Sequence, residues 1–278
     1  MNSRSANQPS LASPPSPMPG FIEQQFLHRR DVQGRKLLVP FITGGMTPDW
    51  TDCVRAAAAV GADAIEIGIP FSDPIMDGPV IQAASVQALA NGATPLSVMG
   101  QVAKLDVGVP LVAMTSYNIA YRAGHERFAQ SLAENGFSGT ILPDLPVEEC
   151  AEWLAVANQH SIETIMLAAP TSSDERLRTI SALSRGWVYG IGSLGVTGER
   201  ADLAASASQI AARLKAATNK PVLIGIGVST PAQAAEVAAI ADGVIVGTAL
   251  VRRILDGEGA AGVEAFVGSL RHGLDARG

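Results

Sequence analysis

The segment DAIEIGIPFSDPIMDGPVIQ (Asp63–Gln82) contains the structural unit that decides the fold. Its first residues form a run rich in isoleucine, which is typical of a β-strand. Ile65, Ile67 and Ile69 lie on one face of this strand, because side chains alternate between the two faces. A loop stiffened by prolines follows, and then an uncharged stretch begins. The segment therefore predicts a strand, a loop and a helix in succession.

The same unit recurs along the chain. Short runs rich in β-branched residues alternate with alanine-rich stretches of helical periodicity. We expect strands at residues 37–43, 64–69, 110–115, 139–142, 163–167, 187–190, 222–225 and 243–246. Helix-start signals follow several of them, at Thr47-Pro48-Asp49, Ser172-Ser173-Asp174 and Ser229-Thr230-Pro231.

Eight strands, each followed by a helix, are typical of a (β/α)8 TIM barrel, an α/β fold of one domain. The alternative is a doubly wound open sheet, which would normally carry a GxGxxG turn after its first strand. The sequence TGGM (Thr43–Met46) does not match that turn. We therefore predict a TIM barrel over residues 21–278. Residues 1–20 are rich in Ser, Pro and Asn without an apolar core, so we expect a disordered leader and not a signal peptide.

The composition excludes several classes of protein. The chain has 278 residues, 47% hydrophobic and 17% charged, so it can bury a full core and is not a disordered chain. Its formal net charge of -6 argues against nucleic acid or an anionic membrane as the main partner. No apolar run of about 20 residues predicts a membrane span. Cys53 and Cys150 are too few for a disulfide framework or a zinc cage, and they fit a reducing cytoplasm.

Glu66 is the residue that points most directly to catalysis. The isoleucines of its strand belong against the surrounding helices, so Glu66 on the opposite face points into the barrel. A buried carboxylate is costly unless it is paired or protonated. A buried ion pair is the alternative, but none of the four lysines and no arginine lies within a predicted strand. We therefore expect Glu66 to be a general acid or base with a raised pKa.

The loop after this strand supplies two more carboxylates, Asp73 and Asp77. Prolines at positions 70, 74 and 79 stiffen the loop, so it can hold a second carboxylate over the barrel mouth. Each aspartate alone is more typical of a turn or a helix cap than of a catalyst. Their position beside Glu66 makes both of them candidates for the chemistry.

Three later loops carry glycines that could hold a phosphate. They are GIGSLGVTGER (Gly190–Arg200), IGIGVST (Ile224–Thr230) and VGTAL (Val246–Leu250). TIM barrels often bind phosphate where the loops after strands seven and eight meet. Gly198, Gly227 and Gly247 offer backbone amides there, and Thr248 begins a helix whose N-terminus favours an anion. Tight turns alone would also explain such glycines, but the convergence of three loops favours a phosphate site.

Other kinds of site have less support. The four histidines are dispersed and show no metal-ligand spacing. A Schiff-base aldolase needs a lysine nucleophile, and no predicted strand supplies one. Magnesium on Glu66, Asp73 and Asp77 remains open, although no specific signature indicates it. The residues thus indicate a metal-free barrel enzyme that performs acid–base chemistry with carboxylates on a phosphorylated substrate.

The segment EIGIPFSDPIMDGPVIQ (Glu66–Gln82) closely resembles the signature of the tryptophan synthase alpha chain family. The resemblance continues in the same order over nearly all of residues 21–275. The other matching segments are VPFITGG (Val39–Gly45), ILPDLPVEE (Ile141–Glu149), GVTG (Gly195–Gly198) and DGVIVGTALV (Asp242–Val251). The acidic loop motif is highly specific, whereas the glycine motifs alone would not be.

This resemblance implies a lyase of tryptophan and aromatic amino-acid biosynthesis. Such chains cleave indole-3-glycerol phosphate into indole and glyceraldehyde 3-phosphate, a retro-aldol reaction. The resemblance makes Glu66 the general acid/base and Asp77 the carboxylate that pairs with the indole N–H and stabilises positive charge on the ring. It places the phosphate on Gly198, Gly227, Gly247 and Thr248. It lines the indole pocket with Phe41, Ile81, Met114, Ile141, Tyr189 and Ile226.

The resemblance also implies a partner protein. Alpha chains form an α2β2 heterotetramer with a beta chain and pass indole to it through a tunnel. Pyridoxal phosphate belongs to the beta chain, so we expect no cofactor in this chain. Asp73, Asn118 and Pro146 match the contact surface for the beta chain. The loop around Thr197 matches a mobile lid, in which Thr197 contacts the acidic loop.

One position departs from the family pattern. Ser116 stands where many relatives carry a tyrosine near the substrate, which affects how the substrate packs and not the class of reaction. Tyr117 follows directly, but in an extended chain it would face the opposite way.

Three functions are compatible with these motifs. The first is an alpha subunit that is weakly active alone and fully active with its beta chain. The second is a freestanding indole-3-glycerol phosphate lyase that releases indole for another pathway. The third is a non-catalytic subunit that activates its partner. The presence of Glu66 and Asp77 argues against the third, and the intact contact positions Asp73, Asn118 and Pro146 argue against the second.

Overall fold

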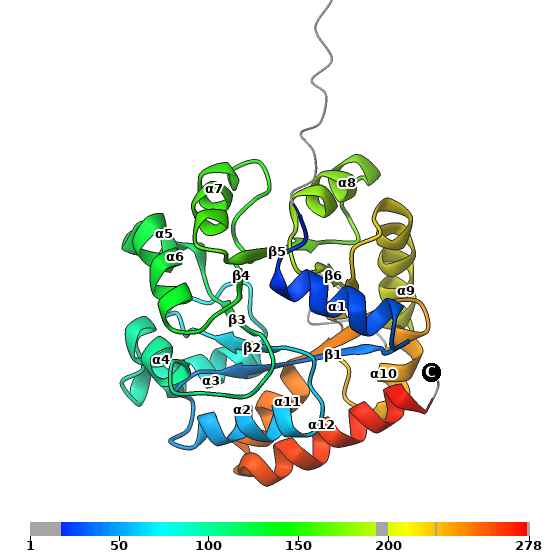
Figure 1. The fold of residues 1–278 in the computed structure, drawn as a ribbon. Helices are drawn as coiled ribbons and strands as arrows, with labels where there is room; N and C mark the ends of the chain where they lie inside the picture. The colour runs from blue at the N-terminus through cyan, green and yellow to red at the C-terminus, as the bar shows by residue number, and fades with distance from the viewer. Residues whose placement is uncertain (1–17, 193–199, 226, 277–278) are drawn as a thin grey trace, which may run out of the picture.

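The computed structural model describes residues 18–192, 200–225 and 227–276, which form a closed barrel of parallel strands (Figure 1). The predicted leader lies outside these residues apart from positions 18–20. Each strand pairs with the next along the chain, and β8 returns to β1. The strands are Leu37–Thr43 (β1), Ile65–Gly68 (β2), Leu111–Met114 (β3), Gly139–Ile141 (β4), Glu163–Ala168 (β5), Val188–Ile191 (β6), Val222–Gly225 (β7) and Gly243–Val246 (β8). This confirms the predicted (β/α)8 barrel.

Helices surround the barrel as an outer ring (Figure 1). In the described part of the chain they are Phe21–Asp31 (α1), Trp50–Ala59 (α2), Pro79–Ala90 (α3), Pro95–Val102 (α4), Tyr117–Ala123 (α5), His125–Glu134 (α6), Ala151–Gln159 (α7), Asp174–Leu183 (α8), Arg200–Ala217 (α9), Pro231–Ala238 (α10), Thr248–Leu255 (α11) and Gly259–Asp275 (α12). Among the described residues, no helix is both long and apolar enough to cross a membrane.

The strands lie where their sequence pattern predicts them. Each begins and ends within one residue of the predicted position. In β2 the side chains also face the predicted sides, because Ile65 and Ile67 belong to the core between the strands and the helices. Ala64, just before β2, belongs instead to the separate core inside the barrel. Glu66 therefore shares the inward face.

The start of α2 differs from the prediction. Thr47 was expected to cap this helix with Pro48 in its first turn, but α2 begins at Trp50 after a turn, and no side chain caps it. The Thr47 hydroxyl is buried without a hydrogen-bond partner. The backbone N–H of Trp50 bonds to the Thr47 carbonyl instead, which closes a turn before the helix. The other two start signals are confirmed, because Ser173 caps α8 and Thr230 caps α10.

Helix α1 lies within the ring of outer helices, across one end of the barrel (Figure 1). That end is the N-terminal end of the strands, because Arg29 of α1 pairs with Asp63, which precedes β2. Ile22 and Phe26 of α1 belong to the core inside the barrel. The Phe26 ring stacks on Trp187, with ring centroids 5.3 Å apart. The opposite, C-terminal end remains for the site.

Candidate active site

A cavity opens at the C-terminal end of the barrel, where TIM barrels carry their active sites. Its walls come from strands and loops that are far apart in sequence. Glu66 and Asp77 line it together with the glycines of the loops after β7 and β8. The structure therefore brings together Glu66 and Asp77, two of the three candidate carboxylates, and the described part of the candidate phosphate cradle.

Glu66 lies on β2 with only 1% of its surface exposed. Its Oε1 atom is buried and has no hydrogen-bond partner. Burial raises the pKa of Glu66 well above its ordinary value of 4.5, because the charged form is desolvated and no cation offsets the cost. Among the residues that the structure describes, no cation is paired with Glu66. Burial therefore favours the protonated form of this carboxyl group, which can donate a proton.

Asp77 enters the same cavity from the loop after β2. The Asp77 N–H bonds to the Pro74 carbonyl at 3.1 Å, and the Gln82 side chain donates to the Asp77 carbonyl at 2.9 Å. These bonds fix the backbone that carries the carboxylate. Burial raises the pKa of Asp77 to about 6, so the group is mostly ionised at neutral pH. Within the described ranges, no group of three His, Cys, Asp or Glu side chains could hold a metal ion.

Tyr189 from β6 borders both carboxylates. Its pKa is raised well above the ordinary value of 10.0, first by burial and then by the nearby charges of Glu66 and Asp77. The phenol therefore stays protonated and can only act as a neutral hydrogen-bonding group. A Cβ on Gly225 would lie 2.5 Å from the Tyr189 hydroxyl, so a glycine is needed on β7 for the ring to lie there.

The candidate phosphate side of the cavity is formed by Gly227, Gly247 and Thr248. Gly227 has a φ of +69°, a conformation that favours glycine. Gly247 is the N-cap of α11 and has no side chain to bond the first helical N–H groups. The Leu250 N–H bonds to the Gly247 carbonyl at 3.0 Å, and the N–H groups before it point to where an anion would bind at the helix N-terminus. Gly198, the remaining predicted phosphate contact, lies outside the described residues.

Most of the predicted indole pocket lines the cavity, with one correction. Phe41, Ile81, Met114 and Tyr189 are in its wall. Ile141 is not: it is fully buried in the core inside the barrel. Its place in the pocket was implied by the resemblance alone, which does not give the depth of a side chain along the barrel axis. Ile226 lies outside the described residues.

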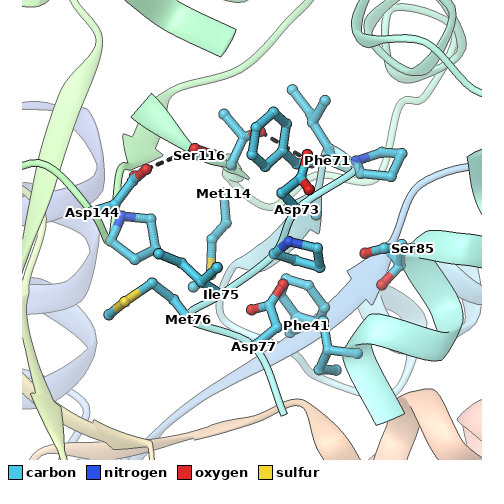
Figure 2. A pocket seen from close by; sticks show the side chains of 18 residues that line it. Phe41, Phe71, Asp73, Ile75, Met76, Asp77, Ser85, Met114, Ser116 and Asp144 are labelled. Carbon is cyan, nitrogen blue, oxygen red and sulfur yellow. Dashed lines mark hydrogen bonds between the residues drawn. The ribbon is translucent and has the colours of Figure 1, made fainter. Parts of the chain in front are cut away.

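A second chamber adjoins the first beneath the acidic loop (Figure 2). Phe41, Met114 and Asp77 border both chambers. Ser116 lies at the far edge of the second chamber, where its hydroxyl donates to Asp144 Oδ2 at 2.7 Å (Figure 2). The space beside Ser116 therefore shares walls with the candidate active site.

Tyr117 was expected to point away from this region because the chain would be extended there. The chain is helical instead, since Tyr117 is the first residue of α5 and Ser116 caps that helix. The side chain of Tyr117 nevertheless turns away from both chambers. Its hydroxyl bonds to His125 Nε2 of α6 at 2.9 Å. It therefore does not replace the tyrosine that relatives carry at position 116.

The three positions predicted to contact a partner are all exposed. Asp73 follows β2, Asn118 is in α5, and Pro146 follows β4. The acidic loop covers the second chamber and exposes two apolar side chains on its outside. These are Ile75 and Met76, which are 85% and 56% exposed. The predicted lid residue Thr197 lies outside the described residues.

Several residues that line the cavity were not predicted from the sequence. They are Met76, Gly78, Pro143, Leu167, Ile191, Gly225 and Ile245. Leu167 and Ile191 lie near the C-terminal ends of β5 and β6 on the inward face. The period-two alternation that identified Glu66 could have found both of them. Pro143 lies on a loop, where no such periodicity exists.

A TIM barrel with a buried, unpaired carboxyl group at the C-terminal ends of its strands has the architecture of a barrel enzyme. A model of the tryptophan synthase alpha chain family matches residues 27–269. The tryptophan synthase alpha chain of Streptomyces coelicolor is 46% identical over 241 residues, which cover 84% of this chain and 87% of the relative. The chain therefore belongs to the tryptophan synthase alpha chain family and is an enzyme of the lyase type.

Solved structures agree with this assignment. A structure of Mycobacterium tuberculosis tryptophan synthase matches with a TM-score of 0.85 and 37% identity, over 92% of this chain and 98% of the other. The tryptophan synthase subunit alpha of Legionella pneumophila matches with a TM-score of 0.82 and 35% identity, over 92% of this chain and 99% of the other.

Proposed function

We propose that this protein is the alpha subunit of tryptophan synthase, a carbon–carbon lyase that cleaves indole-3-glycerol phosphate into indole and glyceraldehyde 3-phosphate. The reaction belongs to the biosynthesis of L-tryptophan. The observation that carries the proposal is Glu66, a fully buried carboxyl group with an unpartnered oxygen in the cavity that Asp77 also lines. One domain, from residue 21 onward, would contain the whole site.

The cleavage needs one proton moved from oxygen to carbon. Protonated Glu66 donates its proton to C3 of the indole ring, which gives the ring a positive charge. The bond between C3 and the glycerol side chain then breaks, and its electron pair returns to the ring. The hydroxyl on the released carbon loses its proton to the Glu66 carboxylate and becomes the aldehyde. Glu66 ends protonated again, so one group serves as both acid and base.

Asp77 would stabilise the charge that forms between these two proton transfers. A carboxylate that accepts a hydrogen bond from the indole N–H favours the cationic ring over the neutral one. With a pKa of about 6, Asp77 is ionised at neutral pH, whereas Glu66 is kept protonated by its burial. The two carboxyl groups therefore have the opposite protonation states that the reaction requires.

The phosphate would bind at the opposite wall of the cavity. Gly227, Gly247 and Thr248 would contact it with backbone amides at the N-terminus of α11, and Gly198 would complete the site. Phe41, Ile81, Met114 and Tyr189 would enclose the indole ring. This arrangement fixes the substrate at both ends, with C3 between them.

The proposed partner is a tryptophan synthase beta chain in an α2β2 heterotetramer in the cytoplasm. The beta chain would hold pyridoxal phosphate and receive the indole. Asp73, Asn118 and Pro146 are exposed near the acidic loop, and Ile75 presents 85% of its surface there. With Met76 beside it, also 56% exposed, Ile75 would be covered by the beta chain in the heterotetramer.

The first test is an indole assay with and without a beta chain. Purified protein with indole-3-glycerol phosphate should yield indole, and a beta chain should raise the rate strongly. High turnover alone without any response to the beta chain would favour the freestanding lyase. No indole under either condition would favour the non-catalytic subunit.

The second test is Glu66→Gln, which keeps the size of the side chain and removes its proton. The variant should fold and bind glycerol 3-phosphate like the parent, with lyase activity lowered about 10²–10⁴-fold. Binding of glycerol 3-phosphate, measured by calorimetry, serves as the control for an intact cavity. A fully active variant would contradict the proposed mechanism.

A further inference from the structure

Thr43 has a buried hydroxyl group without a hydrogen-bond partner. It is the last residue of β1, and only 1% of its surface is exposed. Thr43 lies two residues after Phe41, so both side chains point to the same side of the strand. Both of them line the second chamber beneath the acidic loop. Burying a hydroxyl without a partner is costly, and this one faces a space where a bound molecule can satisfy it.

Three carboxylates line the same chamber, and two of them already have donors. They belong to Asp73, Asp77 and Asp144. The Asp73 carboxylate accepts from the Ser72 hydroxyl at 2.6 Å. The Asp144 carboxylate accepts from the Ser116 hydroxyl at 2.7 Å and from a backbone N–H. The hydrogen bonds of Asp77 within the described part of the chain belong to its backbone, so its carboxylate has no donor there.

No positive charge compensates for the missing donor. Among the described residues that line the second chamber and the candidate active site, there is no lysine, arginine or histidine. The titratable groups that face Asp77 are Asp73 and Asp144 in the second chamber, and Glu66 and Tyr189 in the candidate active site. The described walls can therefore stabilise the Asp77 carboxylate only through neutral donors.

The second chamber is large enough to hold water between these groups. Its cavity volume is about 60 Å³, whereas one buried water needs roughly 10–15 Å³ and two to four polar partners. Thr43 does not bond to Asp77 directly, although both line this space. Ser85 of α3, which is 4% exposed, adds a second hydroxyl to the wall. Figure 2 shows Ser85 and Asp77 among the side chains around the chamber.

We propose that the second chamber is a water site, in which water accepts from the Thr43 hydroxyl and donates to the Asp77 carboxylate. Ser85 is a further donor to this water. Thr43 is thus a positioning residue, which acts through water and does not touch the substrate. The link keeps Asp77 ionised and fixes the direction of its carboxylate. The inference rests on the proposed function, in which that carboxylate accepts the indole N–H.

The experiment compares four variants of the full chain. Thr43→Val keeps the shape of the side chain and removes its hydroxyl, whereas Thr43→Ser keeps the hydroxyl. Ser85→Ala removes the second donor. Thr140→Val is the matched control, because the Thr140 hydroxyl of β4 is also buried without a partner but lines neither chamber.

The first measurement is an infrared titration of carboxyl-labelled aspartate without substrate, with the Asp77→Asn spectrum subtracted. A hydrogen bond to the charged form lowers a pKa. Thr43→Val should therefore raise the pKa of Asp77, by about 0.5–1 pH unit for the loss of one bond. Ser85→Ala should raise it less, and Thr43→Ser and Thr140→Val should leave it unchanged. The acidic limb of the rate profile should move to higher pH together with the Asp77 pKa.

The second measurement is a crystal structure of the parent protein and of Thr43→Val. The parent should show an ordered water within hydrogen-bond distance of both Thr43 Oγ1 and the Asp77 carboxylate. Thr43→Val should lose this water or bind it in another position. A parent chamber without ordered water would overturn the proposal.

The outcomes of the titration separate the steps of the inference. An unchanged Asp77 pKa in Thr43→Val would show that the two groups are not linked. A shift that also appears in Thr43→Ser, or equally in Thr140→Val, would come from packing and would overturn the proposal as well. Because the titration contains no substrate, a parent protein without lyase activity would overturn the proposed function and leave the link between Thr43 and Asp77 standing.

Discussion

At the scale of single residues, the site depends on two carboxyl groups that burial affects to different degrees. Glu66 lies inside the barrel, where no described cation balances it, so burial keeps it protonated. Asp77 lies on a loop at the cavity mouth, where burial raises its pKa only to about 6. Depth in the barrel thus separates the acid from the carboxylate, without any charged neighbour being needed.

The first prediction is a bell-shaped dependence of kcat/KM on pH. Asp77 must be ionised, so activity should rise as the pH increases through about 6. Glu66 must be protonated, so activity should fall again as the pH passes its raised pKa. In Asp77→Asn the acidic limb should disappear, and kcat/KM should fall about 10²–10³-fold. An acidic limb that stayed at the same pH in this variant would belong to another group.

The second prediction concerns how ionisation of Glu66 lowers the free energy of unfolding. The pKa of Glu66 is raised in the folded protein, so ionisation of this group favours the unfolded state. Its contribution to the free energy of unfolding is therefore fully present below the ordinary pKa of 4.5 and is lost as the pH rises through the raised pKa. Glutamine cannot ionise, so Glu66→Gln should be more stable than the parent by roughly 0.5–2 kcal/mol at alkaline pH. Near pH 4.5 the two proteins should unfold at the same urea concentration. A gain of equal size at both pH values would point to packing and not to charge.

At the scale of elements, two similar Thr-Pro sequences behave differently. Thr230 Oγ1 accepts from the Gln233 N–H at 3.3 Å and caps α10. Thr47 precedes Pro48 in the same way, but its hydroxyl is buried without a partner and α2 begins three residues later. The difference lies in tertiary context, because the β1–α2 connection forms a turn before the helix starts.

The third prediction follows from this pair. Thr230→Ala should lower the free energy of unfolding by about 1 kcal/mol, because the Gln233 N–H loses its acceptor. Thr47→Ala removes a buried hydroxyl that bonds to nothing, so it should be neutral or slightly stabilising. Urea unfolding of both variants measures the difference. Equal losses would mean that Thr47 stabilises the turn through contacts other than its hydroxyl.

The same contrast explains how far sequence reasoning extends. Strands such as β1 and β8 were predicted at their observed bounds, because β-branched runs depend mainly on their own residues. Glu66 was found because alternation alone gives the side of a strand. Ile141 was assigned to the indole pocket by the resemblance, and the structure instead buries it in the core inside the barrel. The hydrogen bond from the first turn of α1 to Glu163 could not be predicted, since Glu163 lies 141 residues away from Ile22.

At the scale of the whole molecule, the N-terminal end of the barrel is tied together by one aspartate. Asp63 is fully buried. Its Oδ1 atom accepts from Arg29 of α1 at 2.6 Å and from Arg35 before β1 at 2.8 Å. Its Oδ2 atom accepts from the Leu38 N–H at 2.8 Å and from Arg271 of α12 at 3.3 Å. One side chain thus joins the first helix, the first strand and the last helix.

The fourth prediction is that Asp63 contributes far more to the free energy of unfolding than an exposed ion pair does. Asp63→Asn leaves three guanidinium groups around a neutral side chain, and removing one partner of a buried ion pair costs about 3–5 kcal/mol. Asp31→Asn is the control, because Asp31 is 54% exposed where it pairs with Arg30, and such pairs contribute about 1 kcal/mol or less. Urea unfolding should separate the two variants clearly. If both lost the same small amount, the three arginines would have to be solvated well enough to do without the Asp63 carboxylate.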